Sequence, residues 1–228
     1  MLIGIKIIIP IVKIKFKTNH LENFFKNKNN IRYKKIFKTL MKSFETMNNI
    51  LITGGAGFIG SHICTILLEE NYNVYIVDNF SNSSKKVFDS IKQITQNVKN
   101  FDDKRLNIFD GDIRNEKFLN EVFLNSKKNN RSIDSVIHCA GLKAVKDSIL
   151  NPLSYWDTNV CGSINLLKVM EKNQCRTILF SSSATVYGNS DNIPFKETAK
   201  LCPINPYGET KLTIELILEN LFESNNSK

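Results

Sequence analysis

The chain has 228 residues, of which 42% are hydrophobic and 23% are charged, and its formal net charge is +9. That length is enough for one full domain, and the composition is that of an ordinary soluble globular protein. A charge of +9 suggests a nucleic-acid or membrane partner, but its position argues against one. Residues 1–46 carry 11 Lys/Arg and two acids, whereas residues 47–228 carry 20 of each sign. We therefore predict a neutral domain with no nucleic-acid and no membrane partner.

Residues 1–46 form a basic extension, which we separate from the domain at 47–228. Lysines and Pro10 interrupt its apolar start, so no run of 18 apolar residues exists and a membrane span is not expected. No small-residue cleavage site follows, which argues against a secretory signal peptide. The extension is an organelle-targeting segment, a disordered basic tail, or sequence translated upstream of the native start. Met47 directly precedes the first expected strand and favours the last interpretation. We expect a cytoplasmic protein, with organelle targeting as the alternative.

From Asn48 onwards, short β-branched runs alternate with longer helical stretches. The runs expected to be strands are 49–53, 73–77, 105–109, 135–139 and 176–180. The stretches expected to be helical are 57–70, 83–97, 115–127, about 145–173 and about 206–223. On the last stretch, apolar residues recur at helical spacing: Leu212, Leu216, Ile217 and Leu221. Continuous apolar strands that alternate with helices predict a doubly wound parallel α/β sheet, the Rossmann fold.

The cysteines and histidines show no metal-binding pattern, and we predict no metal site. The histidines are scattered, and the cysteines contain no C-x-x-C pair. An odd number of unpatterned cysteines fits buried thiols in a reducing compartment. The five are Cys64, Cys139, Cys161, Cys175 and Cys202.

The first expected strand runs into the glycine-rich segment 53–60, which continues as a helix. Gly54 permits a tight turn, Gly57 lets the backbone approach a pyrophosphate, and Gly60 lets the helix pack close to the strand. The amides of the helix N-terminus then face the anion. The spacing is G-x-x-G-x-x-G, and a glycine pattern alone is a weak signal. A strand before it and a helix after it are nevertheless typical of a dinucleotide site.

The second expected strand ends in an acidic residue, Asp78, which lies 18 residues after Gly60. A carboxylate at about this separation accepts hydrogen bonds from both ribose hydroxyls and repels a 2′-phosphate. No Lys or Arg follows until Lys85. The pattern therefore predicts NAD, rather than its phosphorylated form, as the cofactor.

Two later strand ends should complete the cofactor cleft, because ligands of such sheets bind outside the carboxyl ends of the strands. They are Gly111-Asp112-Ile113 after the third run and Cys139-Ala140-Gly141 after the fourth. Asp112 is placed to hydrogen-bond the adenine amino group. By spacing alone, a role as a helix N-cap fits Asp112 nearly as well.

The fifth expected strand leads into a serine run that contains Ser183, and Tyr207 and Lys211 follow on the last expected helix. Tyr207 and Lys211 are four residues apart, so both project from one face of that helix. A phenol with a pKa of about 10 is a poor base at neutral pH, but a nearby ammonium and the positive nicotinamide ring favour the phenolate. Ser183 can bind the same substrate oxygen and share its proton. These three residues are the predicted catalytic set.

Together these residues resemble the extended short-chain dehydrogenase/reductase superfamily and, within it, the UDP-glucose 4-epimerases. The resemblance covers about residues 48–223. Its most discriminating matches are GGAGFIGSH (54–62), VDNFSNS (77–83), HCAGLKAV (138–145), SSSATVYG (181–188) and NPYGETK (205–211).

The resemblance implies 4-epimerisation of a UDP-hexose, which interconverts UDP-glucose and UDP-galactose in galactose metabolism. Tyr207 would take the proton of the sugar 4-hydroxyl with help from Ser183, and the C4 hydride would pass to NAD to give a 4-keto sugar. Return of the hydride to the opposite face would invert C4, while Lys211 would bind the nicotinamide ribose. The implied enzyme is an isomerase that holds NAD as a prosthetic group.

Carried over position by position, the resemblance also implies the residues that bind each ligand. Those for the cofactor are Gly54, Gly57, Phe58, Ile59, Gly60, Asp78, Asn79, Asn82, Ser83, Asp112, Ile113, Cys139, Ala140, Gly141, Leu142, Lys143, Asn159, Tyr207 and Lys211. Those for the substrate are Lys143, Ser183 and Tyr207. The match at Thr158-Asn159 is partial, because the family pattern has two adjacent asparagines there.

Two other activities stay as alternatives: an NAD-dependent sugar-nucleotide reductase or dehydratase, and a truncated NAD-binding module without turnover. Families that dehydrate sugar nucleotides carry an Asp-Glu pair where this chain has Ala184-Thr185, so the acid and base for water elimination are absent. That difference favours an epimerase over a dehydratase.

The family continues after the tyrosine helix with a sixth strand and a smaller C-terminal domain that grips the uridine and the sugar, whereas this chain stops at Lys228. We therefore expect a Rossmann domain truncated before the substrate domain, which is either a fragment of a longer product or catalytically crippled. The family dimerises by packing two helices of each subunit into a four-helix bundle. The resemblance thus implies a homodimer through helices within about 145–173.

Overall fold

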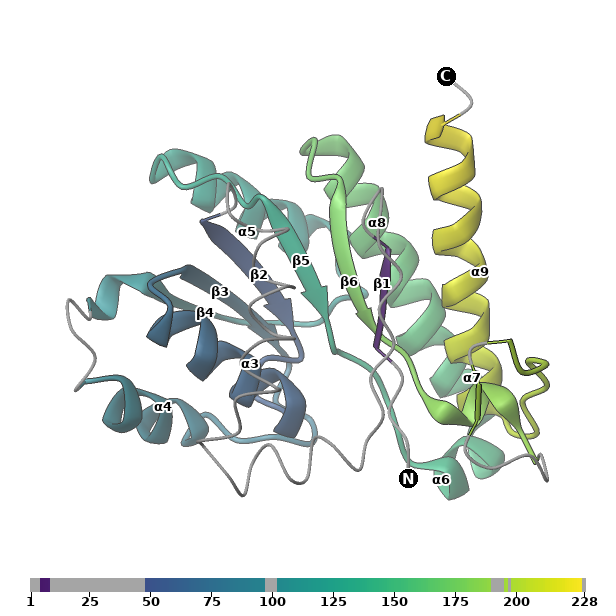
Figure 1. Cartoon of the computed structure of the whole chain (residues 1–228). Coiled ribbons are helices and arrows are strands. Elements are labelled where there is room, and N and C mark those ends of the chain that lie inside the picture. The colour runs from purple at the N-terminus through teal and green to yellow at the C-terminus, as the bar shows by residue number, and fades with distance from the viewer. Residues whose placement is uncertain (1–4, 9–47, 97–101, 190–194, 197, 227–228) are drawn as a thin grey trace.

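The computed structural model describes residues 5–8, 48–96, 102–189, 195–196 and 198–226, and within them one sheet carries the fold (Figure 1). Its strand order is β1-β6-β5-β2-β3-β4. The strands are β1 (Ile5–Ile8), β2 (Asn49–Thr53), β3 (Asn73–Asp78), β4 (Leu106–Asp110), β5 (Ser135–His138) and β6 (Thr177–Ser181). Strands β2 to β6 pair in parallel, which confirms the predicted Rossmann-type sheet.

Helices connect the parallel strands as the alternating pattern predicts. They are α3 (Phe58–Glu69), α4 (Val87–Thr95), α5 (Glu116–Lys128), α6 (Val145–Leu150), α7 (Pro152–Tyr155), α8 (Gly162–Lys172) and α9 (Pro206–Asn226). Two 3₁₀ turns, η1 (Asp103–Arg105) and η3 (Ala184–Tyr187), and the π-helical turn η2 (Trp156–Cys161) complete the described elements. The long stretch expected near 145–173 is thus broken, because Pro152 starts a new helix and the π turn joins α7 to α8.

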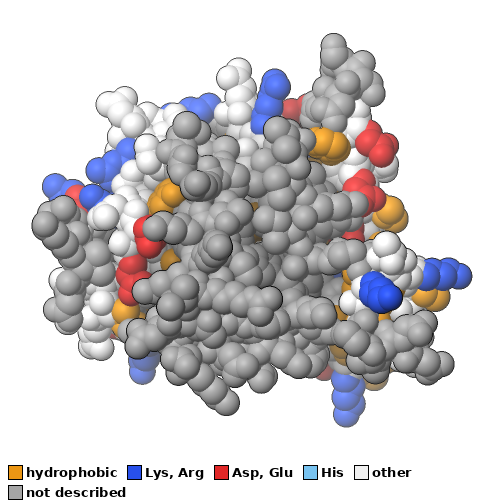
Figure 2. Space-filling view, in the orientation of Figure 1, with side chains coloured by type: hydrophobic (Ala, Val, Ile, Leu, Met, Phe, Trp, Pro, Cys, Tyr) orange, Lys and Arg blue, Asp and Glu red, His pale blue; other side chains and the backbone are white. Residues whose placement is uncertain are grey.

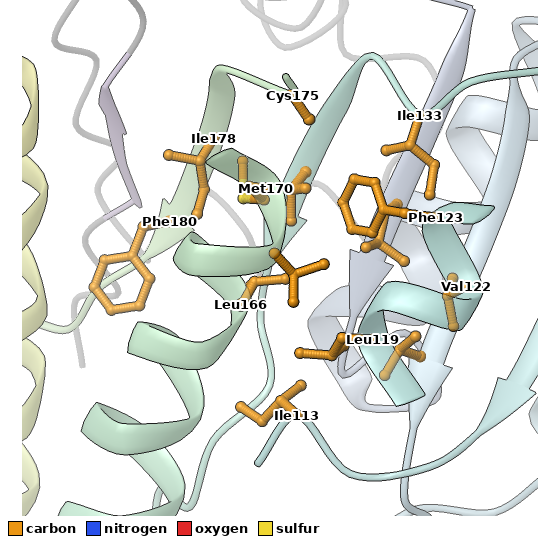
Figure 3. Packing of buried hydrophobic residues seen from close by; sticks show 14 of the residues in the cluster. Ile113, Leu119, Val122, Phe123, Ile133, Leu166, Met170, Cys175, Ile178 and Phe180 are labelled. Atoms are coloured by element: carbon orange, nitrogen blue, oxygen red, sulfur yellow. The ribbon is translucent and has the colours of Figure 1, made fainter. Parts of the chain in front are cut away.

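The helices cover both faces of the sheet. One apolar cluster lies between the sheet and helices α3 and α4, and it includes Ile50, Ile52 and Leu67. The other lies under α5, α8 and α9 (Figure 1). Figure 3 shows how side chains of α5, α8 and β6 meet in this second cluster: Leu119, Val122, Phe123, Leu166, Met170, Ile178 and Phe180. Burial of strands on both faces explains why their sequences are continuously apolar.

Strand β1 adds an antiparallel neighbour to β6. Ile5 pairs with Ser181 and Ile8 pairs with Ile178. The sequence predicts that residues 1–46 lie outside the domain, yet this short part of the extension joins the sheet. The remaining residues of the extension lie outside the described part of the chain.

Helix α9 turns a different face inward from the one its leucine spacing indicates. Ile214 and Leu218 are buried, whereas Leu216 and Leu221 are 49% and 41% exposed. Helix packing on the sheet therefore uses the side that also carries Lys211, and part of the apolar stripe faces outward.

The described surface carries both signs of charge. Figure 2 shows basic and acidic side chains interspersed around one face of the molecule. No described helix is long and apolar enough to cross a membrane. The expectation of buried thiols holds for Cys64 and Cys175, but it is wrong for Cys161 and Cys202, which are exposed free cysteines.

Candidate functional site

The carboxyl ends of the parallel strands bring the predicted site segments to one edge of the sheet. Thr53, the last residue of β2, lies in register with Val77 of β3 on one side and with His138 of β5 on the other. His138 is in register with Phe180 of β6. The segments that follow these residues contain the glycine loop, Asp78, the Cys139 loop and Ser183, so they meet at this edge.

The glycine loop is shaped by two close approaches. Gly54 has a φ of +69°, and a Cβ there would lie 2.6 Å from the backbone nitrogen of Ala140. A Cβ on Gly60 would lie 2.3 Å from the carbonyl oxygen of Gly54. Gly57 precedes α3, whose first amides point out of the helix end. This cradle of bare backbone at a helix N-terminus fits a pyrophosphate, which is the group that the glycine spacing predicts.

Asp78 is 8% exposed and is held by the loops around it. One carboxylate oxygen accepts a hydrogen bond from the Ala56 amide at 2.9 Å. The other accepts bonds from the Phe80 amide and the Ser83 hydroxyl, both at 2.9 Å. The carboxylate is therefore fixed beside the glycine loop, where the sequence predicts a ribose. Asn79 and Asn82 lie exposed on the same loop.

Asp112 is occupied by protein partners in this structure. Arg114 donates to both of its carboxylate oxygens, at 3.0 and 2.8 Å, and the Asn79 side-chain amide donates at 2.9 Å. The hydrogen bonds from Arg114 lower the pKa of Asp112 to about 2. Arg114 also bonds Asp157 of η2 at 2.7 Å. Asp112 thus joins Asn79 to Arg114 and, through Arg114, to η2, and the N-cap of α5 is Asn115 instead.

Asn159 holds the loop that follows β5. It is 1% exposed, its side-chain oxygen accepts the Leu142 amide at 2.7 Å, and its nitrogen donates to the Leu142 carbonyl at 3.0 Å and to Thr210 at 3.1 Å. The resemblance implies a cofactor contact for Asn159, and in this structure its side chain bonds Leu142 and Thr210. Within the same loop Cys139 and Gly141 are partly exposed, and Lys143 is exposed.

Ser183 and Tyr207 form a hydrogen-bonded pair. Ser183 caps η3 and accepts a bond from the Thr185 hydroxyl at 3.0 Å, which leaves its own proton for Tyr207. Burial raises the pKa of Tyr207, and the Ser183 hydrogen bond opposes that rise. Burial is the largest influence on the pKa of this phenol, and the lowering effect comes from Ser183 rather than from Lys211. The ring of Tyr155 packs edge-on against Tyr207, with 6.5 Å between centroids.

Lys211 lies on the inner face of α9, one turn after Tyr207. It is 5% exposed, and its Nζ donates to the Ser181 carbonyl at 3.0 Å. The ammonium lies 4.7 Å from the centre of the Phe180 ring and 5.9 Å from that of Tyr207. Burial lowers the pKa of Lys211 to about 8. The ammonium therefore points at the end of β6, between the Tyr207 ring and the loop that contains Gly141.

Sequence reasoning missed a set of buried polar residues behind the site: Thr53, His138, Ser163, Thr210 and Tyr155. Thr53 and His138 could have been found, because each is a polar residue at the end of a continuously apolar strand. The others were hidden because serine, threonine and tyrosine on helices fit many roles. The described residues contain no group of His, Cys, Asp or Glu that could hold a metal ion.

Chemically, the site combines a phosphate cradle, a ribose-side carboxylate, and a phenol coupled to a hydroxyl and an ammonium. Such a set moves a proton at one substrate oxygen beside a bound dinucleotide. Its members lie at the carboxyl ends of the strands, at the start of α3, or on the first turns of α9.

Comparison with known proteins places the same features in a family. Residues 51–228 match the family described as GDP-mannose 4,6 dehydratase. A bifunctional UDP-glucose 4-epimerase and UDP-xylose 4-epimerase from Pisum sativum is 46% identical over 172 residues, which are 75% of this chain and 47% of that protein. The UDP-glucose 4-epimerase of Bacillus subtilis is 42% identical over 177 residues, which are 78% of this chain and 49% of that protein.

Solved structures give the same result. The UDP-glucose 4-epimerase from Stenotrophomonas maltophila, with bound NAD and formylated UDP-arabinopyranose, matches with a TM-score of 0.68 and 41% identity over 77% of this chain and 48% of that one. The enzyme from Bifidobacterium longum, in complex with NAD+ and UDP, matches with a TM-score of 0.70 and 41% identity over 77% and 49%.

The chain spans about half the length of the curated relatives it matches. Within that half, the glycine loop, the acidic strand end and the Ser183, Tyr207 and Lys211 set occupy one continuous sheet edge. With a family model that covers most of its length and epimerase homologues at 40–46% identity, the chain belongs to the GDP-mannose 4,6-dehydratase family of extended short-chain dehydrogenases/reductases.

Proposed function

We propose that this chain carries the cofactor-binding and catalytic half of an NAD-dependent UDP-hexose 4-epimerase that acts on UDP-glucose and UDP-galactose. The observation that carries the proposal is the hydrogen-bonded pair of Ser183 and Tyr207, with Lys211 one helical turn away, at the sheet edge that also holds the glycine loop. The epimerase relatives, two of which were crystallised with NAD, support it.

The cofactor half of the proposal assigns NAD to the glycine loop and to Asp78. When bound, NAD would supply a hydride acceptor for the sugar C4 and would return the hydride to the same carbon. Gly57 and the first amides of α3 would hold the pyrophosphate, with Phe58 and Ile59 beside it. Asp78 would accept the ribose hydroxyls and disfavour a 2′-phosphate through charge repulsion.

The catalytic half assigns the proton to the hydroxyl of Tyr207. The Ser183 proton points at this oxygen, so Ser183 stabilises the phenolate each time Tyr207 gives up its proton. Lys211 would bond the nicotinamide ribose and add positive charge beside the phenol. Tyr207 would then accept the proton of the sugar 4-hydroxyl and later return it to the opposite epimer.

The segment around η3 favours epimerisation over dehydration. Thr185 donates its hydroxyl proton to Ser183, and neither it nor Ala184 offers a carboxyl group. Water elimination needs an acid and a base at the neighbouring sugar carbons. The Thr185 hydroxyl would instead orient Ser183.

The proposal also includes a cytoplasmic homodimer. The large apolar side chains that α6, α7 and α9 leave exposed are Val145 at 38%, Ile149 at 61%, Leu150 at 67%, Leu153 at 81%, Leu216 at 49% and Leu221 at 41%. These three helices pack on one another along one side of the molecule (Figure 1). An exposed apolar surface of this kind is typical of a subunit interface.

A paired measurement of binding and turnover tests the proposed activity. Tyr207→Phe should leave NAD affinity, measured by calorimetry, within about twofold, because the ring and its packing stay. It should lower the interconversion of UDP-galactose and UDP-glucose by about 10²–10⁴-fold, the usual contribution of a general acid–base group. Glu209→Gln, an exposed change on the same helix, is the control and should leave both values unchanged.

The outcomes separate the alternatives. Accumulation of NADH or a 4-keto product, with no UDP-glucose formed from UDP-galactose, would favour a reductase or dehydratase. NAD binding without turnover by the wild-type chain would favour a binding module. Wild-type turnover that survives Tyr207→Phe would remove the assigned role of Tyr207.

A further inference from the structure

Behind the candidate site, a chain of buried polar groups joins strands β2 and β5 to helices α8 and α9. Its members are at most 1% exposed: Thr53, His138, Asn159, Ser163 and Thr210. The Thr53 hydroxyl lies 2.6 Å from His138 Nδ1, and the Ser163 hydroxyl lies 2.7 Å from His138 Nε2. Buried polar groups that satisfy one another in this way rigidify a site only if every donor finds an acceptor.

The direction of the hydrogen bonds around His138 follows from the one group that can only accept, the Asn159 carbonyl. Ser163 Oγ contacts the main-chain oxygen of Asn159, which accepts only, so the Ser163 hydroxyl must donate there. Ser163 Oγ must then accept from His138, which places a proton on Nε2. Full burial beside the Lys211 ammonium lowers the pKa of His138 to about 3, so the ring is neutral and Nδ1 carries no proton.

The unprotonated Nδ1 also sets the direction of the hydrogen bonds at Thr53. It accepts the proton of the Thr53 hydroxyl, and Thr53 Oγ1 is then free to accept the Ala140 amide, which lies 3.4 Å away. The order of donation is Ala140 to Thr53 to His138, and His138 to Ser163 to Asn159. Every donor on this path has one acceptor.

The same path reaches the catalytic helix through Asn159. Its side chain bonds both the amide and the carbonyl of Leu142, and it donates to Thr210. The Thr210 hydroxyl donates to the Tyr207 carbonyl at 2.8 Å. The loop that carries Ala140 and Leu142 is therefore tied at one end to β2 and at the other to the first turn of α9.

We propose that His138 is a positioning residue. Its neutral Nε2–H tautomer holds the loop after β5 in a fixed position relative to Tyr207. The part of this role that concerns the cofactor rests on the proposed function, which assigns the loop after β5 to the nicotinamide end of NAD. Only this tautomer satisfies Thr53 and Ser163 together. In the opposite tautomer, Nε2 and Ser163 Oγ would face each other with lone pairs only, unless Ser163 withdrew its proton from the Asn159 carbonyl. At Thr53, the Nδ1 proton and the Ala140 amide would both point at Oγ1, and the hydroxyl would lose its acceptor on His138.

Nuclear magnetic resonance tests the tautomer without cofactor. Long-range ¹H–¹⁵N correlations of the 228-residue chain should show a pyrrole-type Nε2 and a pyridine-type Nδ1 for one of the three histidines. The signal is assigned by its loss in His138→Gln. A protonated Nδ1 at His138, or two protonated nitrogens at neutral pH, would overturn the proposal.

A matched pair at Thr53 tests the positioning. Thr53→Val keeps the shape but removes the hydroxyl, so the amide resonances of Ala140 and Leu142 should shift and the NAD dissociation constant should rise about tenfold. Thr53→Ser keeps the hydroxyl and should restore both to within about twofold of wild type. Equal NAD affinity in the two variants, or unshifted loop amides in Thr53→Val, would contradict the positioning role.

The two parts of the test fail separately. A wild-type chain that binds no NAD would refute the proposed function, and the tautomer and the amide shifts would still decide the hydrogen-bond chain. A chain that binds NAD equally well in all three forms would refute the positioning role and leave the proposed function intact.

Discussion

Tyr207 carries the proposed chemistry on one hydroxyl group, and its surroundings act on that group in opposite directions. Burial raises its pKa, while the proton of Ser183 stabilises the phenolate. The Lys211 ammonium lies beside the ring and bonds the Ser181 carbonyl. A positive ring placed in the cleft would add to Ser183 and oppose the burial effect. The resting tyrosine is therefore neutral, and proton transfer is coupled to what occupies the cleft.

We expect Asp78 to decide the choice between NAD and its 2′-phosphorylated form. Asp78→Ala should weaken NAD binding by about 10–100-fold, since a hydrogen bond to a charged group contributes about 1.5–3 kcal/mol. It should also reduce the preference for NAD over its 2′-phosphorylated form, because the repelling charge is gone. Calorimetric titration with both cofactors measures the two effects.

Asp110 is the control for Asp78, because it ends the neighbouring strand β4 and pairs with Lys85 on the surface. Asp110→Ala should leave both affinities unchanged. A variant Asp78→Ala that binds NAD as tightly as wild type would show that the ribose contact lies elsewhere.

The buried ammonium of Lys211 makes stability depend on pH. Its pKa in the folded chain is about 8, against 10.5 for the free side chain, so the unfolded chain holds the proton more tightly. Below pH 8 the folded state carries the full cost of burying the charge, and the cost disappears as pH rises from 8 towards 10.5. Lys211→Met should therefore gain about 2–4 kcal/mol of unfolding free energy at pH 7 relative to its effect at pH 10.

Urea titrations of wild type and variant at pH 7 and pH 10 measure the four unfolding free energies. Subtracting the wild-type value from the variant value at each pH removes the contribution of other titrating groups. Lys168→Met, an exposed change on α8, should have the same effect at both pH values. An equal effect of Lys211→Met at pH 7 and pH 10 would mean that the ammonium is well solvated in the folded chain.

At the scale of elements, two glycines of the glycine loop are expected to have different roles, Gly60 in folding and Gly57 in binding. A Cβ on Gly60 would lie 2.3 Å from the Gly54 carbonyl, whereas one on Gly57 would lie 3.3 Å from the same oxygen. Gly60→Ala should therefore cost about 1–3 kcal/mol of stability through overpacking. Gly57→Ala should cost less than about 1 kcal/mol and should weaken NAD binding, because its methyl group enters the pyrophosphate cradle.

Thermal melting and NAD titration of both variants check this division. A Gly60→Ala variant that melts like wild type would show that α3 can move away from β2. A Gly57→Ala variant that keeps its NAD affinity would show that the pyrophosphate does not approach Gly57.

The elements themselves were predictable where one physical rule dominates. Continuous apolar runs and a glycine loop after the first strand identified β2 to β6 and α3 to within a few residues. The break at Pro152 and the π turn near Asn159 were not found, because helical spacing continues through them. The inward face of α9 was also misjudged, since burial of Lys211 and Glu215 against the sheet contradicts the leucine spacing.

The candidate site was predictable as a set of motifs but not as a network. Tyr207 and Lys211 follow from their four-residue spacing, whereas the partners of His138 lie on segments that are distant in the sequence. The ion pair of Asp112 was missed as well. Its bidentate partner Arg114 is only two residues away, but in the sequence it looks like an ordinary surface charge. Contacts that depend on how loops fold back cannot be derived from residue spacing.

At the scale of the whole molecule, the exposed apolar side chains of α6, α7 and α9 predict self-association. Leu153 is 81% exposed and lies three residues after Leu150, which is 67% exposed, and apolar groups that gather on a surface are typical of interaction sites. Leu153→Lys should convert a dimer to a monomer, because a dimer would have to bury the new ammonium without a partner. Light scattering coupled to size-exclusion chromatography gives the mass of each form.

Leu124 is the matched control for Leu153, because it is a 43% exposed leucine on α5, away from α6, α7 and α9. Leu124→Lys should leave the mass of the particle unchanged, and the melting temperature of both variants should stay near that of wild type, since neither leucine lies in a core. A wild-type monomer would contradict the proposed dimer, and a dimer that persists in Leu153→Lys would place its interface away from Leu153.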